Sequence, residues 1–196
     1  MELRLGILGS GNGSNFQAIA DAITLGHLRA NIVLVASDFS DAHILTRAKN
    51  LGLPVFATPP SKFKTKLEPE IESALAAEMV KAGANILILA GFMRVVKKSL
   101  LDAFPNRIIN IHPSLLPAFP GLKAWEQAFQ AGVSETGCTV HLVNEQIDAG
   151  KILGQTKVPI LPGDTPASLH ERIHAAEHRL FPEILRKIAE DIIPLP

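Results

Sequence analysis

Continuous apolar runs of strand length alternate with segments of helical periodicity, and this alternation restricts the possible folds more than any other feature. The runs Leu3–Leu8, Ile32–Ala36 and Ile86–Ala90 have the length and composition of strands that are buried on both faces. Apolar residues recur with helical spacing in residues 16–23, 42–51 and 68–82. Strands that alternate with helices pair in parallel and are covered by helices on both faces. The sequence therefore predicts an α/β fold around a mostly parallel central sheet.

The second half of the chain predicts a different kind of strand pairing. Residues 107–111 form a further predicted buried strand, whereas Cys138–Val143 and Lys151–Ile160 are longer and are joined by a short, glycine-ended turn. A short connection of this kind joins antiparallel neighbours, so we expect an antiparallel C-terminal strand pair added to the sheet. Thr165 can cap a final helix, in which Pro182 is expected to introduce a kink.

Length, charge and cysteine content limit the functional class. A chain of 196 residues suits a single domain, and no linker divides residues 1–196. Nineteen basic residues balance nineteen acidic ones, so we expect no nucleic-acid partner. The longest apolar run, Ala84–Met93, is too short to span a bilayer, and no signal segment is evident, which predicts a cytoplasmic protein without a membrane contact. The single cysteine, Cys138, excludes an internal disulfide and is expected to be buried.

Asn110 and His112 place a hydrogen-bonding amide and a titratable imidazole at the end of the fifth predicted strand. In a strand, residues two apart face the same side, so these side chains would project together while Ile109 and Ile111 bury the opposite face. The carboxyl ends of strands are where α/β sheets usually carry their sites. Asp148, in the turn between the two long strands, could reach this strand end and raise the pKa of the histidine. The alternative is that Asn110 and His112 are a polar pair at the strand end, with hydrogen bonds to the local backbone and no catalytic role.

The turn from Gly9 to Asn15 joins the first strand to the first helix and contains three glycines. Its backbone N–H groups and the helix N-terminus that follows could hold a phosphate. The turn lacks the third glycine of a dinucleotide-binding fingerprint, since Ser14 stands there, and it also lacks the lysine of a P-loop. The alternative is a tight turn that only closes a strand–helix unit.

Two further patterns match known kinds of site only in part. Asp38, at the end of the second strand, could bind a ribose as in dinucleotide enzymes, but the glycine pattern before it does not fit. His174, Glu177 and His178 match a zinc-binding motif, and His170 extends the same helix face, but no later helix supplies a third ligand. We therefore expect no metal, and a polar helix face that meets solvent or substrate.

Five segments carry a family resemblance by their order and spacing. They are Ser10–Asn15, Ala90–Arg94, Asn110–Pro117, Phe119–Gly121 and Asp148–Gly150. With them the chain resembles the phosphoribosylglycinamide formyltransferases, folate-dependent enzymes, from its first strand to His178. The set of Asn110, His112 and Asp148 would indicate only the wider group of enzymes that use 10-formyltetrahydrofolate. The phosphate-type turn and the lack of an extra domain indicate the phosphoribosylglycinamide formyltransferases within that group. The resemblance implies a single-domain, Rossmann-like formyltransferase fold over residues 1–196.

The resemblance implies transfer of the formyl group of 10-formyltetrahydrofolate to the amine of N1-(5-phosphoribosyl)glycinamide, here called glycinamide ribonucleotide. This reaction belongs to de novo purine (IMP) biosynthesis and needs no metal. Attack of the amine creates a tetrahedral oxyanion, which Asn110 and a protonated His112 would stabilise. Asp148 would keep His112 charged and help to place a water that moves the proton from the amine to the folate nitrogen.

The resemblance also assigns binding residues to the two small-molecule substrates. The residues implied for glycinamide ribonucleotide are Gly13, Ser14, Asn15 and Phe16 at the phosphate and Glu177 at the ribose hydroxyls. The residues implied for the folate are Lys66, Met93, Arg94, Val95, Val96 and Asn110, with the loop 142–148 around the pteridine. The resemblance also divides the domain approximately into a phosphate-binding half, residues of about 1–100, and a folate-binding and catalytic half, residues of about 101–196, to which Lys66 and the segment 93–96 are exceptions.

Some details of the family pattern are left open by this sequence. Phe16 stands where leucine is commoner, and Lys123 stands where histidine is common, so the role of position 123 is undefined. The family also suggests a cis peptide bond between Leu116 and Pro117. The oligomeric state is open between monomer and homodimer.

Three alternative functions can be weighed against the transferase. A hydrolase that releases formate from 10-formyltetrahydrofolate could use the same three catalytic residues, but such enzymes usually carry an extra N-terminal domain. A formyltransferase for initiator tRNA would need a further C-terminal domain and a basic face. A non-catalytic nucleotide-binding module is the alternative from a different class, and a His112→Ala variant would leave its function intact.

Overall fold

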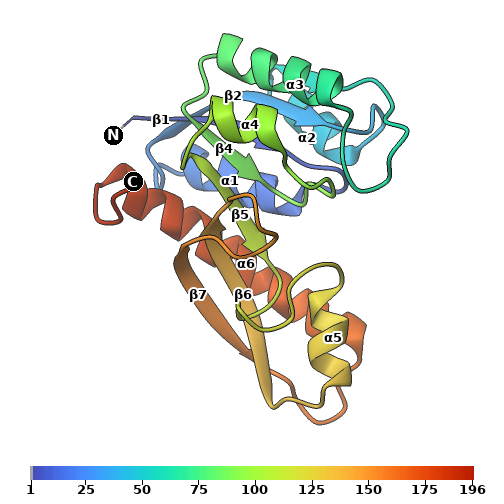
Figure 1. Ribbon diagram of the computed structural model, residues 1–196. Coiled ribbons are helices and arrows are strands. Elements are labelled where there is room, and N and C mark those ends of the chain that lie inside the picture. Colours follow the sequence, from blue (N-terminus) through green and yellow to red (C-terminus); the bar gives the residue numbers. More distant parts are fainter. Residues whose placement is uncertain (1) are drawn as a thin grey trace.

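Seven strands form one mixed sheet in the computed structural model, which describes residues 2–196 (Figure 1). The strands are β1 (Leu3–Leu8), β2 (Ala30–Ser37), β3 (Val55–Ala57), β4 (Ile86–Leu89), β5 (Ile108–His112), β6 (Glu135–Leu142) and β7 (Ile152–Pro159). Their order across the sheet is β3-β2-β1-β4-β5-β6-β7, and the first five strands pair in parallel. Strand β6 is antiparallel to β5, and β7 is antiparallel to β6. The predicted parallel sheet with an antiparallel C-terminal pair is confirmed.

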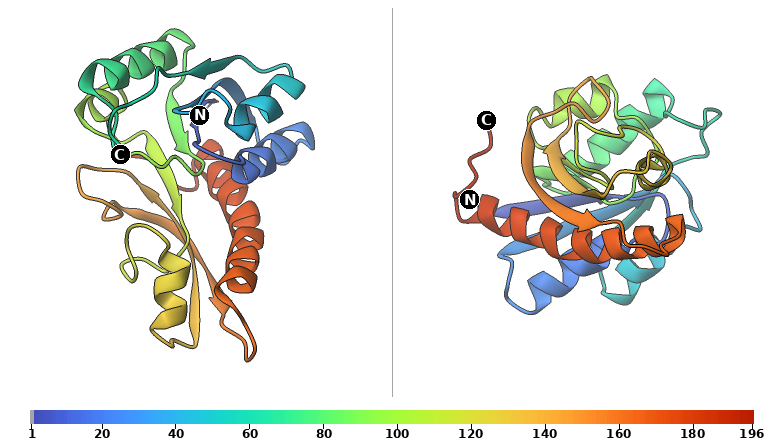
Figure 2. Two further views of the ribbon diagram at one scale, coloured as in Figure 1. Left: turned by 90° about the vertical axis from the view of Figure 1, so that its right-hand side faces the viewer. Right: turned by 90° about the horizontal axis from the view of Figure 1, so that it is seen from below.

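Helices cover both faces of the sheet, as predicted (Figure 2). They are α1 (Ser14–Thr24), α2 (His43–Asn50), α3 (Pro69–Lys81), α4 (Lys98–Ala103), α5 (Ala124–Gln130) and α6 (Pro166–Ala189). Apolar residues of α1, α2 and α6 pack with Leu5 and Ile7 on one face, and those of α3 and α4 pack with Leu8 and Leu87 on the other. The short helices α4 and α5 are not among the predicted elements. Within residues 2–196, none of the helices is long and apolar enough to cross a membrane.

The helix α6 begins where the sequence predicts and is held by a reciprocal cap. The Thr165 side chain accepts from the Ser168 N–H, and the Ser168 side chain accepts from the Thr165 N–H. The buried apolar stripe consists of Leu169, Ile173, Ala176, Leu180 and Ile184. The helix is continuous through Pro182, and the kink expected there stays a prediction. Because α6 contacts α1 as well as β6 and β7, it brings C-terminal residues close to the turn that follows β1 (Figure 1).

The strand order creates a crevice at the carboxyl edge of the sheet. From β1 the chain moves outward to β2 and β3, and then crosses to the other side of β1 to form β4 and β5. The connections that leave β1 and β4 therefore diverge, which is where open α/β sheets bind ligands. The register aligns Leu8 of β1, Leu89 of β4 and Asn110 of β5 across three neighbouring strands. The turn after β1 and the end of β5 thus lie at the same edge.

The loop after β5 is attached to β6. The Leu116 N–H donates to Thr139 Oγ1, and the Thr139 hydroxyl donates to the Ser114 carbonyl. The peptide bond between Leu116 and Pro117 is cis, which confirms the prediction. Cys138 is fully buried, also as predicted, and burial raises the pKa of its thiol to about 12.

Candidate active site

The turn after β1 presents a row of backbone donors that have no backbone partner. Helix α1 begins at Ser14, and Gly13 precedes it with a φ of 77°, a left-handed conformation that glycine adopts without strain. The N–H groups of residues 11–16 donate to no backbone carbonyl within residues 2–196. Such donors at a helix N-terminus attract anions, because the helix dipole adds partial positive charge there. The turn therefore has the donors that a phosphate needs.

Helix α2 fixes the shape of this turn from behind. The Ile44 N–H donates to the Gly11 carbonyl at 3.0 Å, and the Ile44 side chain packs against Gly13. A Cβ atom at position 13 would lie 2.7 Å from side-chain atoms of Ile44. Both the positive φ and this close approach require glycine at position 13.

A hollow of about 320 Å³ opens in front of the turn, where β1 and β4 end. It is lined by Ser10, Gly11, Asn12, Gly13, Ser14, Asn15, Ala90, Gly91, Met93 and His174. The two loops are joined, since the Ser10 N–H donates to the Gly91 carbonyl at 3.0 Å and the Met93 N–H donates to the Ser10 hydroxyl at 2.8 Å. The phosphate-type turn and the start of the predicted folate segment therefore share one crevice.

Glu177 lies buried on α6 next to this crevice. Its side chain accepts a hydrogen bond from Asn15 Nδ2 at 2.9 Å, although 162 positions separate the two residues in the chain. His174 Nε2 lies 4.0 Å from the same carboxyl oxygen. Burial raises the pKa of Glu177 to about 7, against the opposing effect of the Asn15 hydrogen bond. Asn15 and Glu177, which the family resemblance assigns to glycinamide ribonucleotide, are thus neighbours. With a pKa of about 7, the Glu177 carboxyl exists in both protonation states near neutral pH.

The three residues of the predicted catalytic set meet at the end of β5. Asp148 Oδ2 lies 3.4 Å from His112 Nδ1, and the other ring nitrogen, Nε2, lies 2.9 Å from the Phe119 carbonyl oxygen. Both ring nitrogens of His112 therefore face oxygen acceptors. Asp148 also accepts from the Gly121 N–H at 2.8 Å, which fixes the carboxylate. The turn that carries Asp148 does reach the strand end that bears Asn110 and His112.

Burial and the Asp148 carboxylate act on the pKa of His112 in opposite directions. Burial lowers the pKa of His112 below its ordinary value, and the Phe119 carbonyl and the Asp148 carboxylate oppose this effect only in part. Burial alone would raise the pKa of Asp148, but hydrogen bonds from His141 and Gly121 and the nearby imidazoles hold it below its ordinary value. The two shifts favour an ionised aspartate and a neutral histidine in the free protein. Asp148 raises the pKa of His112, as expected, but desolvation of the imidazolium lowers it by more.

His141, on β6, completes the cluster and is not among the predicted site residues. The antiparallel pairing of β5 and β6 places it directly opposite Asn110. His141 Nε2 lies 3.2 Å from Asn110 Nδ2 and 3.6 Å from Asp148 Oδ1, while Nδ1 lies 2.8 Å from the Leu142 carbonyl oxygen. The signal that could have found it is a titratable side chain inside the otherwise apolar end of a strand.

The predicted folate segment, residues 93–96, follows β4 at the same edge. Met93 is exposed and lines the crevice, whereas Val96 is buried. Arg94 is also buried, and its guanidinium donates to the Asp38 carboxylate and to the Phe63 carbonyl. The Arg94 side chain is therefore engaged within the protein, so a ligand could meet only its backbone. Asp38 is buried and is the ion-pair partner of Arg94, and this argues against the alternative in which it binds a ribose.

The two lysines singled out from the sequence lie at the surface. The Lys66 ammonium sits 4.6 Å above the centre of an aromatic ring of its own loop. The Val95 N–H donates to the Thr65 carbonyl at 2.8 Å, so this loop is attached to the predicted folate segment. Lys123 precedes α5 in a left-handed conformation and forms an ion pair with Glu126 at 3.0 Å. Position 123 thus has a local structural contact.

The zinc-like motif of α6 forms a ladder of rings. The imidazoles of His170, His174 and His178 follow one another along the helix, and Trp125 of α5 stacks on His170 with ring centroids 3.7 Å apart. Burial lowers the pKa of His170 to about 4. Within residues 2–196, no group of three or more His, Cys, Asp and Glu side chains is arranged to hold a metal ion.

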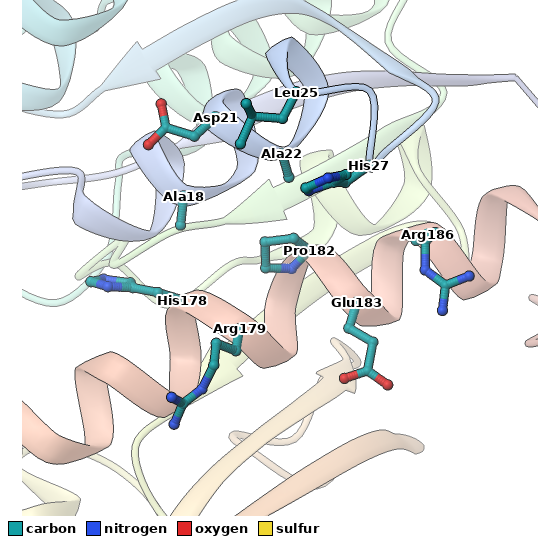
Figure 3. Close-up of a pocket in the computed structure, with 10 residues that line it drawn as sticks. All are labelled: Ala18, Asp21, Ala22, Leu25, His27, His178, Arg179, Pro182, Glu183 and Arg186. Atoms are coloured by element: carbon teal, nitrogen blue, oxygen red, sulfur yellow. The ribbon is translucent and has the colours of Figure 1, made fainter.

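A second hollow, of about 470 Å³, lies between α1 and α6 (Figure 3). Ala22 of α1 faces Pro182 of α6 across it, whereas Arg179 and Glu183 point away from α1 (Figure 3). Among the residues that the structure describes, those that line it include none of the predicted site residues. Side chains of both charge signs surround it, so it favours no class of ligand.

Comparisons with known proteins agree with the fold. The sequence pattern of the family described as Formyl transferase matches residues 3–185. The phosphoribosylglycinamide formyltransferase of Bacillus subtilis (strain 168) is 38% identical, over 94% of this chain and 94% of that protein. The crystal structure of glycinamide ribonucleotide transformylase 1 from Symbiobacterium toebii matches with a TM-score of 0.94 at 44% identity, over 100% of this chain and 91% of that chain.

Longer relatives contain a similar region as part of a larger protein. The trifunctional purine biosynthetic protein adenosine-3 of Homo sapiens is 39% identical over 98% of this chain. The chain spans only 19% of the length of that protein, and 14% of its counterpart from Drosophila pseudoobscura pseudoobscura. By contrast, it spans 94% of the relative from Bacillus subtilis. The chain belongs to the formyl transferase family, among the phosphoribosylglycinamide formyltransferases.

Proposed function

We propose that the protein transfers the formyl group of 10-formyltetrahydrofolate to the amine of glycinamide ribonucleotide, in de novo purine biosynthesis. The observation that carries this assignment, beside family membership, is the alignment of Leu8, Leu89 and Asn110 across β1, β4 and β5. Neighbouring strands lie about 5 Å apart, so the phosphate-type turn and the catalytic cluster are separated by about 10 Å. A ribonucleotide whose phosphate rests on the turn can bridge this distance and bring its amine to Asn110 and His112.

In the proposed reaction the amine nitrogen attacks the formyl carbon, and the carbonyl electron pair moves to oxygen. Asn110, on β5, donates a hydrogen bond to this oxyanion, and the negative charge favours the form of His112 that has taken a proton from solvent, because Phe119 and Asp148 offer acceptors to its two ring nitrogens. The attacking amine becomes acidic as it bonds to carbon. A water placed with the help of Asp148 carries the amine proton to the folate nitrogen as the old carbon–nitrogen bond breaks.

The ribonucleotide would occupy the crevice at the end of β1. Its phosphate would accept from the backbone N–H groups of Gly13, Ser14, Asn15 and Phe16, and its ribose hydroxyls would meet Glu177. The hydrogen bond between Asn15 and Glu177 supports this assignment, since it joins the residue proposed for the phosphate to the residue proposed for the ribose. A carboxyl with a pKa of about 7 can accept from one hydroxyl and donate to another.

The folate would lie along the segment after β4 and reach the loop 142–148. Met93 and Ile147 are exposed apolar residues in these two segments. They offer the apolar surface against which a flat ring system such as the pteridine would lie. Arg94, Val95 and Val96 would offer backbone contacts, and the Lys66 loop would meet the glutamate tail. Residues of about 1–100 would then supply the phosphate site and residues of about 101–196 the catalytic groups, although one sheet runs through both.

The first experiment measures the consumption of 10-formyltetrahydrofolate by purified protein with and without glycinamide ribonucleotide. Consumption that requires the ribonucleotide, with formation of the N-formyl product, is the expected result. Equal consumption without it would mean a hydrolase, and none in either case would mean a binding module. The His112→Ala variant is the control, since it should lose turnover and keep most of its substrate binding.

We also infer a cytoplasmic location and a monomeric or homodimeric state. The assignment to purine biosynthesis supports the location, as does the single buried cysteine, which has no partner for an intrachain disulfide. Sedimentation equilibrium would distinguish the two oligomeric states, and an assembly larger than a dimer would contradict the expectation.

A further inference from the structure

We propose that Arg47, on α2, is a positioning residue for the substrate phosphate. It holds the turn after β1 in its anion-binding shape and strengthens the donors of that turn. The inference rests on the proposed function, because it takes the phosphate of glycinamide ribonucleotide as the ligand of the turn. Arg47 itself does not line the crevice, so it acts through Asn12 and not by touching the substrate.

Arg47 binds Asn12 through two of its nitrogen atoms. Nε donates to the Asn12 carbonyl at 2.9 Å, and Nη2 donates to the Asn12 side-chain oxygen at 2.7 Å. The third nitrogen, Nη1, reaches Gln17 Oε1 on α1 at 3.4 Å. His43 Nδ1 lies 3.4 Å from the same Asn12 carbonyl. One planar guanidinium thus joins α2, the turn and α1, in a fork geometry that an ammonium group cannot reproduce.

These carbonyl contacts determine where the N–H groups of the turn point. A trans peptide unit is planar, so its N–H points opposite to its C=O. Helix α2 takes the Gly11 carbonyl through the Ile44 N–H, and the Asn12 carbonyl through Arg47. The N–H groups of the same two peptide units belong to Asn12 and Gly13, and they therefore point away from α2. Both residues line the crevice, so this is the orientation that an anion there requires.

Arg47 also brings positive charge to the turn. Its three acceptors are neutral oxygen atoms of Asn12 and Gln17, and within residues 2–196 no ion pair joins it to an acidic side chain. The nearest carboxylate in this network, Asp21, accepts from the amide of Gln17. A cation that is hydrogen-bonded to a peptide carbonyl polarises the whole peptide group. The Gly13 N–H, which shares that peptide group, becomes a stronger donor to phosphate.

The experiment compares the kinetics of Arg47→Met and Arg47→Lys with those of the wild type. Arg47→Met removes the charge and all the donors, and it should raise the KM for glycinamide ribonucleotide about tenfold or more, the effect expected for a lost charge-assisted hydrogen bond. The kcat and the KM for the folate should change little, because the catalytic cluster is untouched. Arg47→Lys keeps the charge but cannot bind both oxygens of Asn12. Its KM for glycinamide ribonucleotide should therefore lie between that of the wild type and that of Arg47→Met. This variant also keeps the test decisive if Arg47→Met does not fold.

Two controls separate positioning of the phosphate from general damage to the fold. Lys49→Met removes one positive charge from the exposed face of the same helix, and it should leave every kinetic constant unchanged. Glycinamide ribonucleoside, which lacks the phosphate, is the second control. Its kcat/KM should be the same in the wild type and in Arg47→Met, so the advantage in kcat/KM of the phosphorylated substrate should shrink about tenfold, in proportion to the rise in its KM.

Two outcomes would overturn the inference. One is an unchanged KM for the ribonucleotide in a folded Arg47→Met or Arg47→Lys variant. The other is an equal loss of kcat/KM for the ribonucleotide and the ribonucleoside, since that would mean that Arg47 only supports the fold. Failure of the wild type to formylate the ribonucleotide would instead overturn the proposed function, and the two failures are therefore distinguishable.

Discussion

Replacing Glu177 with glutamine should stabilise the protein at alkaline pH and leave its stability in acid unchanged. Glu177 is buried on α6 and accepts a hydrogen bond from Asn15. Burial raises the pKa of Glu177 from an ordinary value of 4.5 to about 7. Glutamine has the shape of the protonated carboxyl and can keep the bond from Asn15, but it carries no charge at any pH.

The free energy of unfolding should fall as the pH rises between these two pKa values. Below about pH 4.5 the carboxyl is protonated in both states, so it creates no difference. Between the two values the unfolded chain loses the proton while the folded protein keeps it, which favours unfolding. A difference of about 2.5 pH units between the two pKa values corresponds to a loss of about 3 kcal/mol in the free energy of unfolding, and this loss is complete above about pH 7. Glu177→Gln avoids this loss, so its advantage over the wild type should grow from nothing in acid to about 3 kcal/mol.

Urea denaturation at a series of pH values, followed by fluorescence of the single tryptophan, measures this difference. Glu171→Gln is the matched control, since it removes a carboxylate from the exposed face of the same helix and should show no gain that grows with pH. A stability difference between Glu177→Gln and the wild type that stays constant from acid to alkaline pH would refute the burial argument.

The same substitution should raise the KM for glycinamide ribonucleotide, because the amide nitrogen of glutamine cannot accept from a ribose hydroxyl. Higher stability combined with weaker substrate binding is the pattern of a group that is retained for function at a cost in stability. An unchanged KM would separate the two roles and remove Glu177 from the proposed ribose site.

Substitutions in the catalytic cluster and in the turn should have distinct effects. Asp148→Asn removes the carboxylate that lies 3.4 Å from His112 Nδ1, and it should lower the pKa of His112 further. An NMR titration of the His112 imidazole would measure this pKa, and an unchanged value would show that Asp148 is not coupled to the histidine. Gly13→Ala should destabilise the protein by about 1–3 kcal/mol and raise the KM for the ribonucleotide, because of the left-handed φ and the contact with Ile44. Denaturant unfolding would measure the loss, and Gly11→Ala, where an added Cβ has nothing within 4 Å, is the control that should show little destabilisation.

Much of the fold could be predicted because the longer elements carry their periodicity in the sequence. The buried strands β1, β2 and β4 are continuous apolar runs, and α6 shows both its cap and its apolar stripe. Helices α4 and α5 could not be found in this way, since six or seven residues complete fewer than two helical turns. Helix α4 contacts α3 and α5 contacts α6, and these tertiary contacts are not encoded in any local pattern.

The site could be predicted most directly where its residues share one element, although the approach of Asp148 from the turn between the two long strands could also be expected. Asn110 and His112 are two apart on a strand, so their common face follows from strand geometry. The ion pair between Arg94 and Asp38, and the position of His141 opposite Asn110, depend on which strands become neighbours. The protonation of His112 depends on how deeply the loop after β5 buries the ring, and this too is a property of the assembled fold.

The hydrogen bond between Asn15 and Glu177 has a consequence for how activity arises during synthesis. It joins the first helix of the structure to the last, so most of the chain must be made before the ribose side of the substrate site exists. Closing so long a stretch of chain costs entropy and slows folding, even when the strands near the N-terminus have already paired. A nascent chain that still lacks α6 therefore cannot hold the ribonucleotide between these two residues. The appearance of catalytic activity would report the docking of the final helix.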